Sequence, residues 1–302
     1  MTTPLLIVGG NSRAARSFRA LVSQRGQGAK ILAREKGPAL AGETWITTAD
    51  YFQPPVEAFD RGGVVVNFVG ATSGPTEKGL MRLNAEGPIE LAGRARSAGA
   101  AGFVQLSSLS IFGGAEDIDH GTIPAPKSAY GRSKLAAETG LLALSDKDFR
   151  IVLARAPMIY GPQGGGKLSQ LLRLWSAVGV LPAPRRLEQR SMVHVQNLAL
   201  AIHGAIEDGP TRVIFPCDPE PFDLAVLRDA IRAETGRGVR LQTMPSLFFD
   251  LLARAAPSVY DSLYARSLVA RDSRAPLPSE AISLDMSLRD FVRAELVRIA
   301  DA

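Results

Sequence analysis

The sequence lacks the features that mark several classes of protein. It has one cysteine, Cys217, in 302 residues, so no internal disulfide can form. No Cys and His residues show the spacing of a zinc site, and we expect no bound metal. No apolar run reaches the roughly 20 residues that span a bilayer, and the chain opens without a basic, cleavable leader. We therefore expect a protein of the reducing cytosol with no membrane insertion.

Charge of one sign is also not concentrated anywhere in the chain. The formal net charge is +5, from 35 Lys and Arg against 30 Asp and Glu, but the basic residues are interspersed with acidic ones. A solvated surface explains this better than a basic patch, so we expect no nucleic-acid partner. At 46% hydrophobic and 22% charged residues, the composition is that of a folded globular protein.

Short apolar runs alternate with longer stretches of helical periodicity through the first half of the chain. The expected strands are residues 4–8, 30–33, 63–69, 102–106 and 150–154, and the expected helices are residues 13–23, 78–98 and 130–144. Such alternation predicts parallel strands with right-handed crossovers. The fold class is therefore α/β, a Rossmann-type doubly wound parallel sheet, with residues 1–156 as the dinucleotide-binding domain.

Beyond Pro157 the pattern becomes less regular. We expect residues 157–302 to form mainly a smaller C-terminal substrate-binding lobe, with segments returning to the first domain. Its expected elements are helices at 168–178, 224–234, 246–255 and 288–299 and short strands near Val213 and Val239.

A tight turn follows the first strand and opens the first helix. Gly9 fills the first place of a Gly-x-x-Gly-x-x-Gly pattern, while Ser12 and Ala15 replace the other glycines. The turn, with Asn11, Ser12 and Arg13, can present backbone N–H groups and a positive helix end to a pyrophosphate. A plain structural turn is an equal alternative for the isolated motif.

The second strand ends without the acidic residue that usually selects NAD. Arg34 stands there, and together with Arg13 it could pair with a ribose 2′-phosphate, which favours NADP(H) over NAD(H) as cofactor. Two solvent-exposed arginines are the alternative. Asp50, at a later strand end, could accept a hydrogen bond from adenine or could cap a turn. Phe68, Val69 and Gly70 close another strand, where a glycine permits close approach of a cofactor.

Three side chains can exchange a proton with a substrate beside a nicotinamide cofactor. Ser108 ends an apolar strand, at the edge of a parallel sheet where ligands bind. Tyr130 and Lys134 are four residues apart and share one face of a helix, so the ammonium should favour the ionised phenol. Ser108 would bind a substrate oxygen, Tyr130 would exchange its proton, and Lys134 would also bind the nicotinamide ribose.

Taken in order, the motifs are more specific than any one alone. The glycine turn, Ser108, Tyr130 with Lys134, and the run from Arg155 through Pro157 to Pro162 resemble the extended short-chain dehydrogenase/reductase family, in its NAD-dependent epimerase/dehydratase branch. The resemblance implies catalytic Ser108, Tyr130 and Lys134, with Ser110 beside the substrate. Asn84, in an Asn-x-x-Gly motif, and Pro157 would border the cofactor.

The stretch from Arg190 to Ala199 is similar to the family's Arg-x-x-x-His-Val-x-Asp-Leu-Ala motif, with Asn197 in place of Asp. The resemblance implies that Arg190 contacts a nucleotide diphosphate, which suits a guanidinium. His194 is expected to be a packed or capping histidine rather than a catalytic one. The finer likeness is to UDP-sugar 4-epimerases and UDP-4-keto-sugar reductases, and the family also implies a homodimer.

Three functions follow as hypotheses. The first is an NAD(P)-dependent oxidoreductase or epimerase that performs 4-keto reduction or C4 epimerisation of a nucleotide-linked sugar. The second is a non-catalytic NADP(H)-binding sensor or scaffold, and the third is a reductase of a small carbonyl substrate. The complete Ser, Tyr and Lys set argues against the second, and the response of ligand affinity to loss of Arg190 would separate the first from the third.

Overall fold

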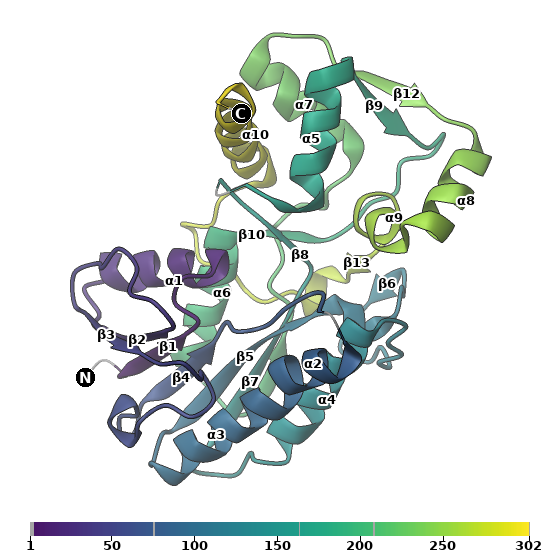
Figure 1. Ribbon diagram of the computed structural model, residues 1–302. Coiled ribbons are helices and arrows are strands. Elements are labelled where there is room, and N and C mark those ends of the chain that lie inside the picture. The colour runs from purple at the N-terminus through teal and green to yellow at the C-terminus, as the bar shows by residue number, and fades with distance from the viewer. Residues whose placement is uncertain (1–2, 75, 163, 208, 302) are drawn as a thin grey trace.

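A seven-stranded parallel sheet forms the centre of the larger domain (Figure 1). The computed structural model describes residues 3–74, 76–162, 164–207 and 209–301. Along the sheet the strands run in the order β11, β7, β5, β4, β1, β2, β3. Their bounds are β1 (Leu5–Val8), β2 (Ala29–Ala33), β3 (Glu43–Thr47), β4 (Val64–Asn67), β5 (Gly102–Ser108), β7 (Arg150–Ala156) and β11 (Arg212–Ile214).

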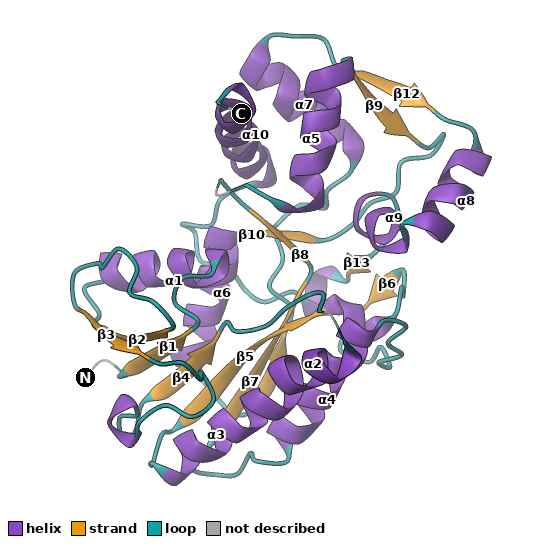
Figure 2. Cartoon of the chain, viewed as in Figure 1, coloured by secondary structure: helices purple, strands orange, loops and turns teal. Residues whose placement is uncertain are grey.

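Helices cover both faces of the sheet (Figure 2). On one face lie α1 (Arg13–Gln24) and α6 (Val195–Glu207), which share a buried core with β1 and β4. On the other lie α3 (Gly87–Ser97) and α4 (Ala129–Leu142), preceded by the short helix α2 (Glu77–Met81). The central strands β1 and β4 are apolar because they are buried on both sides, whereas the edge strand β3 is partly exposed. This arrangement confirms the predicted doubly wound α/β fold.

The strand order reverses between β1 and β4, whose pairing starts at Leu5 with Val64 and ends at Val8 with Asn67. In an open parallel sheet, ligands bind at the carboxyl ends of the strands beside such a reversal. The glycine turn after β1 and Ser108 at the end of β5 lie at this edge. The fold therefore brings the predicted cofactor turn and the predicted reacting end to the same side of the sheet.

The remaining elements form a smaller lobe with its own apolar core. Its helices are α5 (Gly166–Val178), α7 (Leu224–Thr235), α8 (Ser246–Ala255), α9 (Pro257–Leu263) and α10 (Leu284–Ala300), and its strands are β9 (Val180–Ala183) and β12 (Arg240–Thr243). Short parallel pairs complete the fold: β8 (Met158–Tyr160) with β10 (Met192–His194), and β6 (Asp117–Ile118) with β13 (Leu268–Val269).

Two local predictions were wrong. The strand at Val213, expected in the smaller lobe, is β11 of the main sheet, paired with β7. The helix expected over residues 78–98 is interrupted by a π-helical turn at Arg82–Glu86. Pro88 has no N–H to donate to the Asn84 carbonyl, so the regular helical ladder cannot pass through this point.

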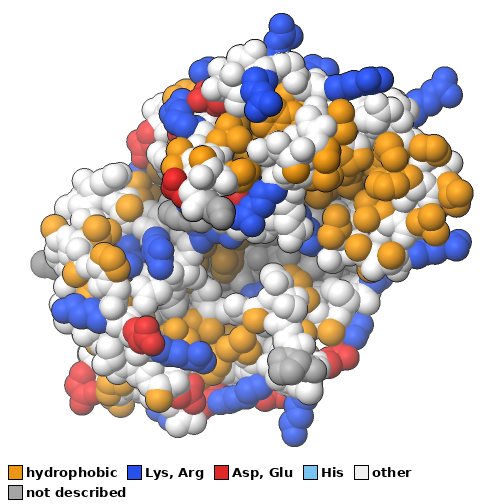
Figure 3. Space-filling model, turned by 45° about the horizontal axis from the view of Figure 1, so that its top comes forward, with side chains coloured by type: hydrophobic (Ala, Val, Ile, Leu, Met, Phe, Trp, Pro, Cys, Tyr) orange, Lys and Arg blue, Asp and Glu red, His pale blue; other side chains and the backbone are white. Residues whose placement is uncertain are grey.

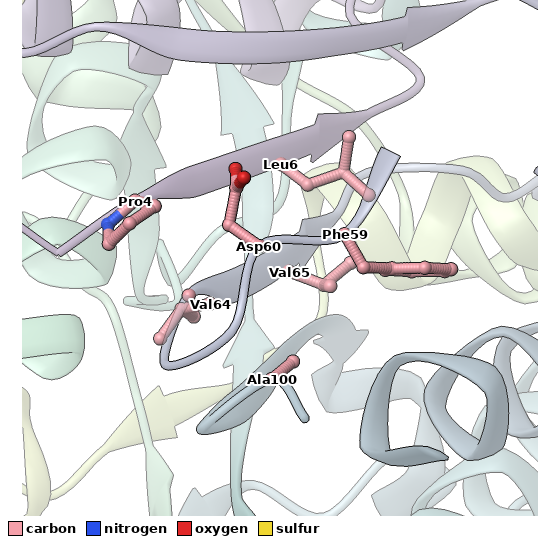
Figure 4. Close-up of a pocket in the computed structure, with 8 residues that line it drawn as sticks. Pro4, Leu6, Phe59, Asp60, Val64, Val65 and Ala100 are labelled. Atoms are coloured by element: carbon pink, nitrogen blue, oxygen red, sulfur yellow. The ribbon is translucent and has the colours of Figure 1, made fainter. Parts of the chain in front are cut away.

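None of the described residues forms a helix long and apolar enough to cross a membrane. A shallow surface depression lies beside Pro4, Leu6, Val64 and Ala100 (Figure 4). These residues lie at the amino ends of β1, β4 and β5, opposite the edge that carries Ser108. The depression is therefore not part of the predicted site.

Candidate active site

The start of α4 determines where Tyr130 and Lys134 lie. Ser128 is the N-cap, and its Oγ accepts a hydrogen bond from Gly131 N at 3.0 Å. Gly131 packs against the loop after β5 so closely that a Cβ there would lie less than 3.0 Å from Ser110 O. This close approach brings the first turn of α4, with Tyr130, against the end of β5.

Ser108 and Tyr130 meet at this contact. Ser108 caps the short 3-10 helix Leu109–Phe112, where its Oγ accepts from Ser110 N at 3.2 Å. Burial raises the pKa of the Tyr130 phenol, and a hydrogen bond with Ser108 opposes the rise. The expected lowering of this pKa by the lysine is not found, so in this structure the phenol is protonated at neutral pH.

Lys134 is buried on the same face of α4. Its Nζ donates to Leu106 O of β5 at 2.9 Å and lies 5.9 Å from the centroid of the Tyr130 ring. Burial lowers the pKa of Lys134 to about 8, and the charge of Glu138 opposes this. The ammonium is thus buried between α4 and β5 and does not point into solvent.

Asn84 and Gly70 bring the end of β4 to the lysine. The Asn84 side chain accepts from Ala71 N and donates to Ala71 O, both at 2.9 Å, and also donates to Ser133 Oγ at 3.0 Å. A Cβ on Gly70 would lie 3.1 Å from both Asn84 Oδ1 and Lys134 Nζ. Asn84 therefore positions the strand end, and Gly70 leaves the space that the lysine side chain uses.

The glycine turn has the geometry that a dinucleotide requires. Gly9 has φ +78°, and a Cβ there would lie 2.9 Å from Val69 Cγ2. A Cβ on Gly10 would come within 3.0 Å of Ile31 Cγ2, so the second glycine is required as well, which the pattern search did not find. Ser12 caps α1 by accepting from Ala15 N at 3.3 Å. The other N–H groups of the first turn of α1 remain directed at this edge.

The side chains around this turn are partly engaged elsewhere. Asn11 Nδ2 donates to Glu35 O at 2.8 Å, which ties the turn to the segment after β2. Arg13 is close to the smaller lobe, where Arg298 and Glu295 of α10 influence its charge, and burial lowers its pKa. It therefore faces the boundary between the lobes, not the end of β2.

Three further predicted cofactor residues make other contacts. The Arg34 guanidinium lies 5.2 Å from the centroid of the Tyr51 ring. Asp50 Oδ1 accepts from Phe52 N at 2.8 Å, which is the turn-capping alternative. Phe68 is buried against Phe18, at 5.6 Å between ring centroids, so its side chain belongs to the core and can offer a cofactor only its backbone.

Pro157 and Ser110 lie on the reacting side. Pro157 joins β7 to β8, so it directly follows the carboxyl end of a central strand. Ser110 Oγ is buried and has no hydrogen-bond partner among the described residues. A buried hydroxyl without a partner is costly unless a ligand supplies one, which fits its predicted place beside the substrate.

Two positively charged side chains, Arg190 and Lys167, lie in the smaller lobe. Arg190 is 7% exposed, and its side chain donates to Asp261 O at 2.6 Å, while its Nε has no partner among the described residues. Burial lowers the pKa of Arg190 to about 10. Lys167, in the first turn of α5, donates to Ser262 Oγ at 2.7 Å, and Arg190 contributes to lowering its pKa after burial. Sequence reasoning missed Lys167, whose signal was its place at a helix start after three glycines.

His194 is a packed histidine, as expected. It is 4% exposed, lies 5.4 Å from the Tyr160 ring, and burial lowers its pKa to about 4. Its backbone N donates to Asp218 Oδ1 at 2.9 Å, as does Asn197 Nδ2 at 2.7 Å. The family motif has Asp at the position of Asn197. In this chain the Asn197 side chain instead donates a hydrogen bond to the carboxylate of Asp218.

The sequence did not reveal one buried ion pair beside the site. Glu138 of α4 is 2% exposed and pairs with Arg155 of β7 at 2.8 Å. Its i, i+4 relation to Lys134 was a signal that could have indicated it. Within the described ranges, no group of three His, Cys, Asp or Glu side chains could hold a metal ion.

The larger domain and the smaller lobe enclose a hollow, with Lys and Arg side chains along its border (Figure 3). Ser108, Tyr130 and Lys134 come from the sheet side, whereas Arg190 and Lys167 come from the smaller lobe. The arrangement can exchange a proton with a substrate oxygen at one end and bind an anionic group at the other.

Comparison with known proteins identifies the family. Residues 19–215 match the model of the NAD dependent epimerase/dehydratase family. The chain is 31% identical over 128 residues to UDP-glucose 4-epimerase of Vibrio cholerae, covering 38% of this chain and 37% of that protein. It is 30% identical over 178 residues to dTDP-4-dehydrorhamnose reductase of Streptomyces griseus, covering 56% and 54%. The matched regions thus span about half or less of these relatives.

The fold is shared over the whole length. The structure of UDP-glucuronic acid 4-epimerase from Bacillus cereus in complex with NAD superposes with a TM-score of 0.76 at 14% identity, covering 98% of this chain and 100% of that one. At this identity the likeness concerns the fold alone.

These findings correct the predicted cofactor. NADP(H) was wrong: the family description names NAD, and the neighbouring structure holds NAD. The physical reason is that Arg34 stacks on Tyr51 while Arg13 faces α10, so the two guanidinium groups do not form a joint site for a 2′-phosphate. The cradle at Gly9 and Gly10 and the lysine beside Gly70 fit a dinucleotide. The chain belongs to the NAD dependent epimerase/dehydratase family and is an enzyme of the extended short-chain dehydrogenase/reductase type.

Proposed function

We propose that this enzyme transfers hydride at C4 of a nucleotide-linked sugar, as a 4-keto reductase or a C4 epimerase. The observation that carries the proposal is the meeting of the Tyr130 phenol with Ser108 beside the buried Lys134 at the carboxyl edge of the sheet. The names of the relatives, a UDP-glucose epimerase and a dTDP-sugar reductase, support a sugar nucleotide as substrate.

NAD, when bound, supplies the acceptor or donor of the hydride. Gly9, Gly10 and the start of α1 would hold its pyrophosphate, and Lys134 would bind the ribose hydroxyls next to the nicotinamide. We assign the cofactor to the domain formed mainly by residues 1–156, and the substrate chiefly to the lobe formed by residues 157–302.

Tyr130 handles the proton. In the reducing direction its O–H donates to the sugar oxygen as hydride reaches the attached carbon, and in the oxidising direction the phenolate takes the proton back. Because burial raises the pKa of Tyr130, the protonated phenol is ready to donate to a ketone oxygen. Ser108 would hold that oxygen by a hydrogen bond, as it does the Tyr130 phenol in the structure, with the Lys134 Nζ 5.9 Å from the centroid of the phenol ring.

Arg190 and Lys167 would bind the diphosphate of the substrate. Their charges lie together at the start of α5, whose N-cap Gly165 makes no side-chain capping bond. A guanidinium with a free Nε and a helix amino end both suit phosphate oxygens. Binding there would leave the sugar directed toward the larger domain.

The test is the Tyr130→Phe variant with NADH and a UDP-4-keto-hexose. We expect turnover to fall by about 10²–10⁴-fold while NAD affinity stays unchanged, because only the proton donor is lost. Tyr264→Phe is the matched control, since burial also raises the pKa of this phenol but it lies in the smaller lobe. Equal turnover of Tyr130→Phe and the wild type would refute the proposal. NADH loss equal to substrate indicates reduction, and interconversion of UDP-hexoses without net loss indicates epimerisation.

The family resemblance also predicts a homodimer built on α3 and α4. Sedimentation of the purified enzyme tests this prediction: a species of twice the 32.2 kDa chain mass is expected, and a monomer at all concentrations would contradict it.

A further inference from the structure

A carboxylate is buried one helical turn beyond Lys134. Glu138 is 2% exposed, and its oxygens accept hydrogen bonds from two elements other than α4. Ser107 Oγ of β5 donates to Glu138 Oε1 at 2.5 Å. Arg155 of β7 donates to Glu138 Oε2 through Nη2 at 2.8 Å and through Nε at 3.1 Å. An acidic side chain is rarely buried to this degree unless it is paired, as it is here.

The cation of this pair is itself held in place. Arg155 lies with its guanidinium 5.3 Å from the Phe112 ring and 5.9 Å from the Phe215 ring, and its side chain is 12% exposed. A two-bond pair between aromatic rings fixes the carboxylate in one orientation. Glu138 is therefore a rigid group on the helix that carries the proposed proton donor.

The contacts of Glu138 fall on the residues that neighbour the reacting groups. Ser107, which donates to Glu138, directly precedes Ser108 in β5. Leu106, which precedes Ser107, provides the carbonyl that accepts from Lys134 Nζ. Glu138 and Lys134 thus fasten α4 to β5 at consecutive residues, immediately before the strand ends at Ser108.

The charged groups around Lys134 also link it to Glu138. Glu138 is the acidic group whose charge opposes the loss of the Lys134 proton on burial. Arg155 faces the carboxylate from β7, and the phenol of Tyr130 faces the lysine on its own helix. Other ion pairs around α4 and α3 lie at the surface: Arg132 with Glu77, Arg82 with Glu90, and Arg96 with Asp146. Water screens these surface ion pairs, so they have little effect on the charge of the buried Lys134.

We propose that Glu138 is a positioning residue of the active site, which holds α4 on β5 and keeps the buried Lys134 charged. Its role in turnover rests on the proposed function, whereas its effect on Lys134 does not. With Arg155 and Lys134 as two cations and Glu138 as one anion, the cluster keeps a single net positive charge beside the phenol. Loss of the carboxylate would leave two like charges, and Lys134, which can release a proton, would do so.

The first readout needs no substrate. We measure the pKa of Lys134 by NMR titration of the ¹³Cε-labelled full chain, with the signal assigned through Lys134→Arg. In Glu138→Gln the pKa should fall by about one pH unit or more, from about 8, because a buried charge one helical turn away is lost. Glu77→Gln is the matched control, since it removes a surface ion pair to the same helix, and it should leave the pKa unchanged. An unchanged pKa in Glu138→Gln would overturn the proposal.

Glu138→Asp serves where Glu138→Gln does not fold. This variant keeps the negative charge but moves it about one methylene away from Lys134. Where both variants fold, the pKa of Lys134 in Glu138→Asp should lie between the values of the wild type and Glu138→Gln. Where only Glu138→Asp folds, this pKa should fall by less than about one pH unit. No fall in Glu138→Asp, in the absence of a folded Glu138→Gln, would count against the proposal.

The second readout is the pH profile of kcat for NADH-dependent reduction of a UDP-4-keto-hexose. The alkaline limb should move to lower pH in Glu138→Gln, recover in part in Glu138→Asp and stay in place in Glu77→Gln. A purely structural role would lower kcat at all pH values and leave the limb in place, which would overturn the proposal. If the wild type does not turn over the sugar but the pKa of Lys134 still falls in Glu138→Gln, the proposed function fails and the positioning role stands.

Discussion

The tight turn after β1 allows a prediction of both stability and cofactor affinity. Gly10 is buried beneath β2, and a Cβ there would come within 3.0 Å of Ile31 Cγ2, closer than real Cβ atoms approach. Ile31 is fully buried, so it cannot move aside without disturbing the sheet. Gly10→Ala should therefore destabilise the protein by about 1–3 kcal/mol, the usual cost of one extra methyl in a packed core.

Two matched variants isolate the cause. Gly93 lies inside α3, and a Cβ there would meet nothing within 4 Å. Gly93→Ala should therefore stabilise the folded protein by about 0.5–1 kcal/mol, because alanine lowers the conformational entropy of the unfolded chain. Ile31→Ala removes the clashing methyl, after which the nearest atoms to the new Cβ lie at 3.8 Å. In that background Gly10→Ala should cost little, although Ile31→Ala alone costs about 2–5 kcal/mol.

Urea unfolding of the four chains of this cycle measures the coupling. We expect the two losses to be non-additive by about 1–3 kcal/mol. Gly10→Ala should also weaken NAD binding by about tenfold, because a displaced turn misplaces the N–H groups at the start of α1. Strict additivity, or a Gly10→Ala chain as stable as Gly93→Ala, would refute the steric reasoning.

The remaining predictions concern the smaller lobe. Burial raises the pKa of Asp218 from 3.8 to about 6, so the folded chain holds a proton that the unfolded chain releases between these values. Stability should therefore fall as pH rises from about 4 to 6, and wild type should lose about 3 kcal/mol relative to Asp218→Asn, as measured by urea unfolding at each pH. Parallel profiles for the two chains would contradict this. Arg190→Ala should weaken UDP binding by calorimetry at least about tenfold, because a phosphate contact is lost, whereas Arg186→Ala, at an 88% exposed side chain, should not. Unchanged UDP affinity in Arg190→Ala would favour a small carbonyl substrate.

Much of the fold was predictable because a strand that is buried on both faces of the sheet appears in the sequence as a short run of apolar residues. The apolar runs at β1, β4 and β7 appear in the sequence as strands, and helix starts such as Ser12 and Ser128 are ordinary caps. The ends of elements were less predictable. β5 continues to Ser108 because Ser107 and Ser108 pair with β7, which local sequence does not reveal.

The arrangement of the candidate site was predictable where residues stand at fixed spacing on one element. Ser108, Tyr130 and Lys134 converge as their spacing indicated, since one helix face and one strand end determine their directions. The directions of Arg13 and Arg34 were not predictable, because long side chains follow contacts formed only in the folded chain. Burial also decided the direction in which the pKa of Tyr130 shifts: desolvation raises this pKa, and the hydrogen bond with Ser108, not the lysine that the sequence suggested, opposes the rise.

We have proposed that hydride passes between the nicotinamide and C4 of a sugar nucleotide beside Tyr130. The direct measurement mixes the enzyme with NADH deuterated at the transferring position of C4 and a UDP-4-keto-hexose, then locates deuterium in the sugar by mass spectrometry. We predict deuterium at sugar C4 in the wild type and almost none in Tyr130→Phe over the same time. A sugar without deuterium in the wild type, or equal labelling by both chains, would contradict the account.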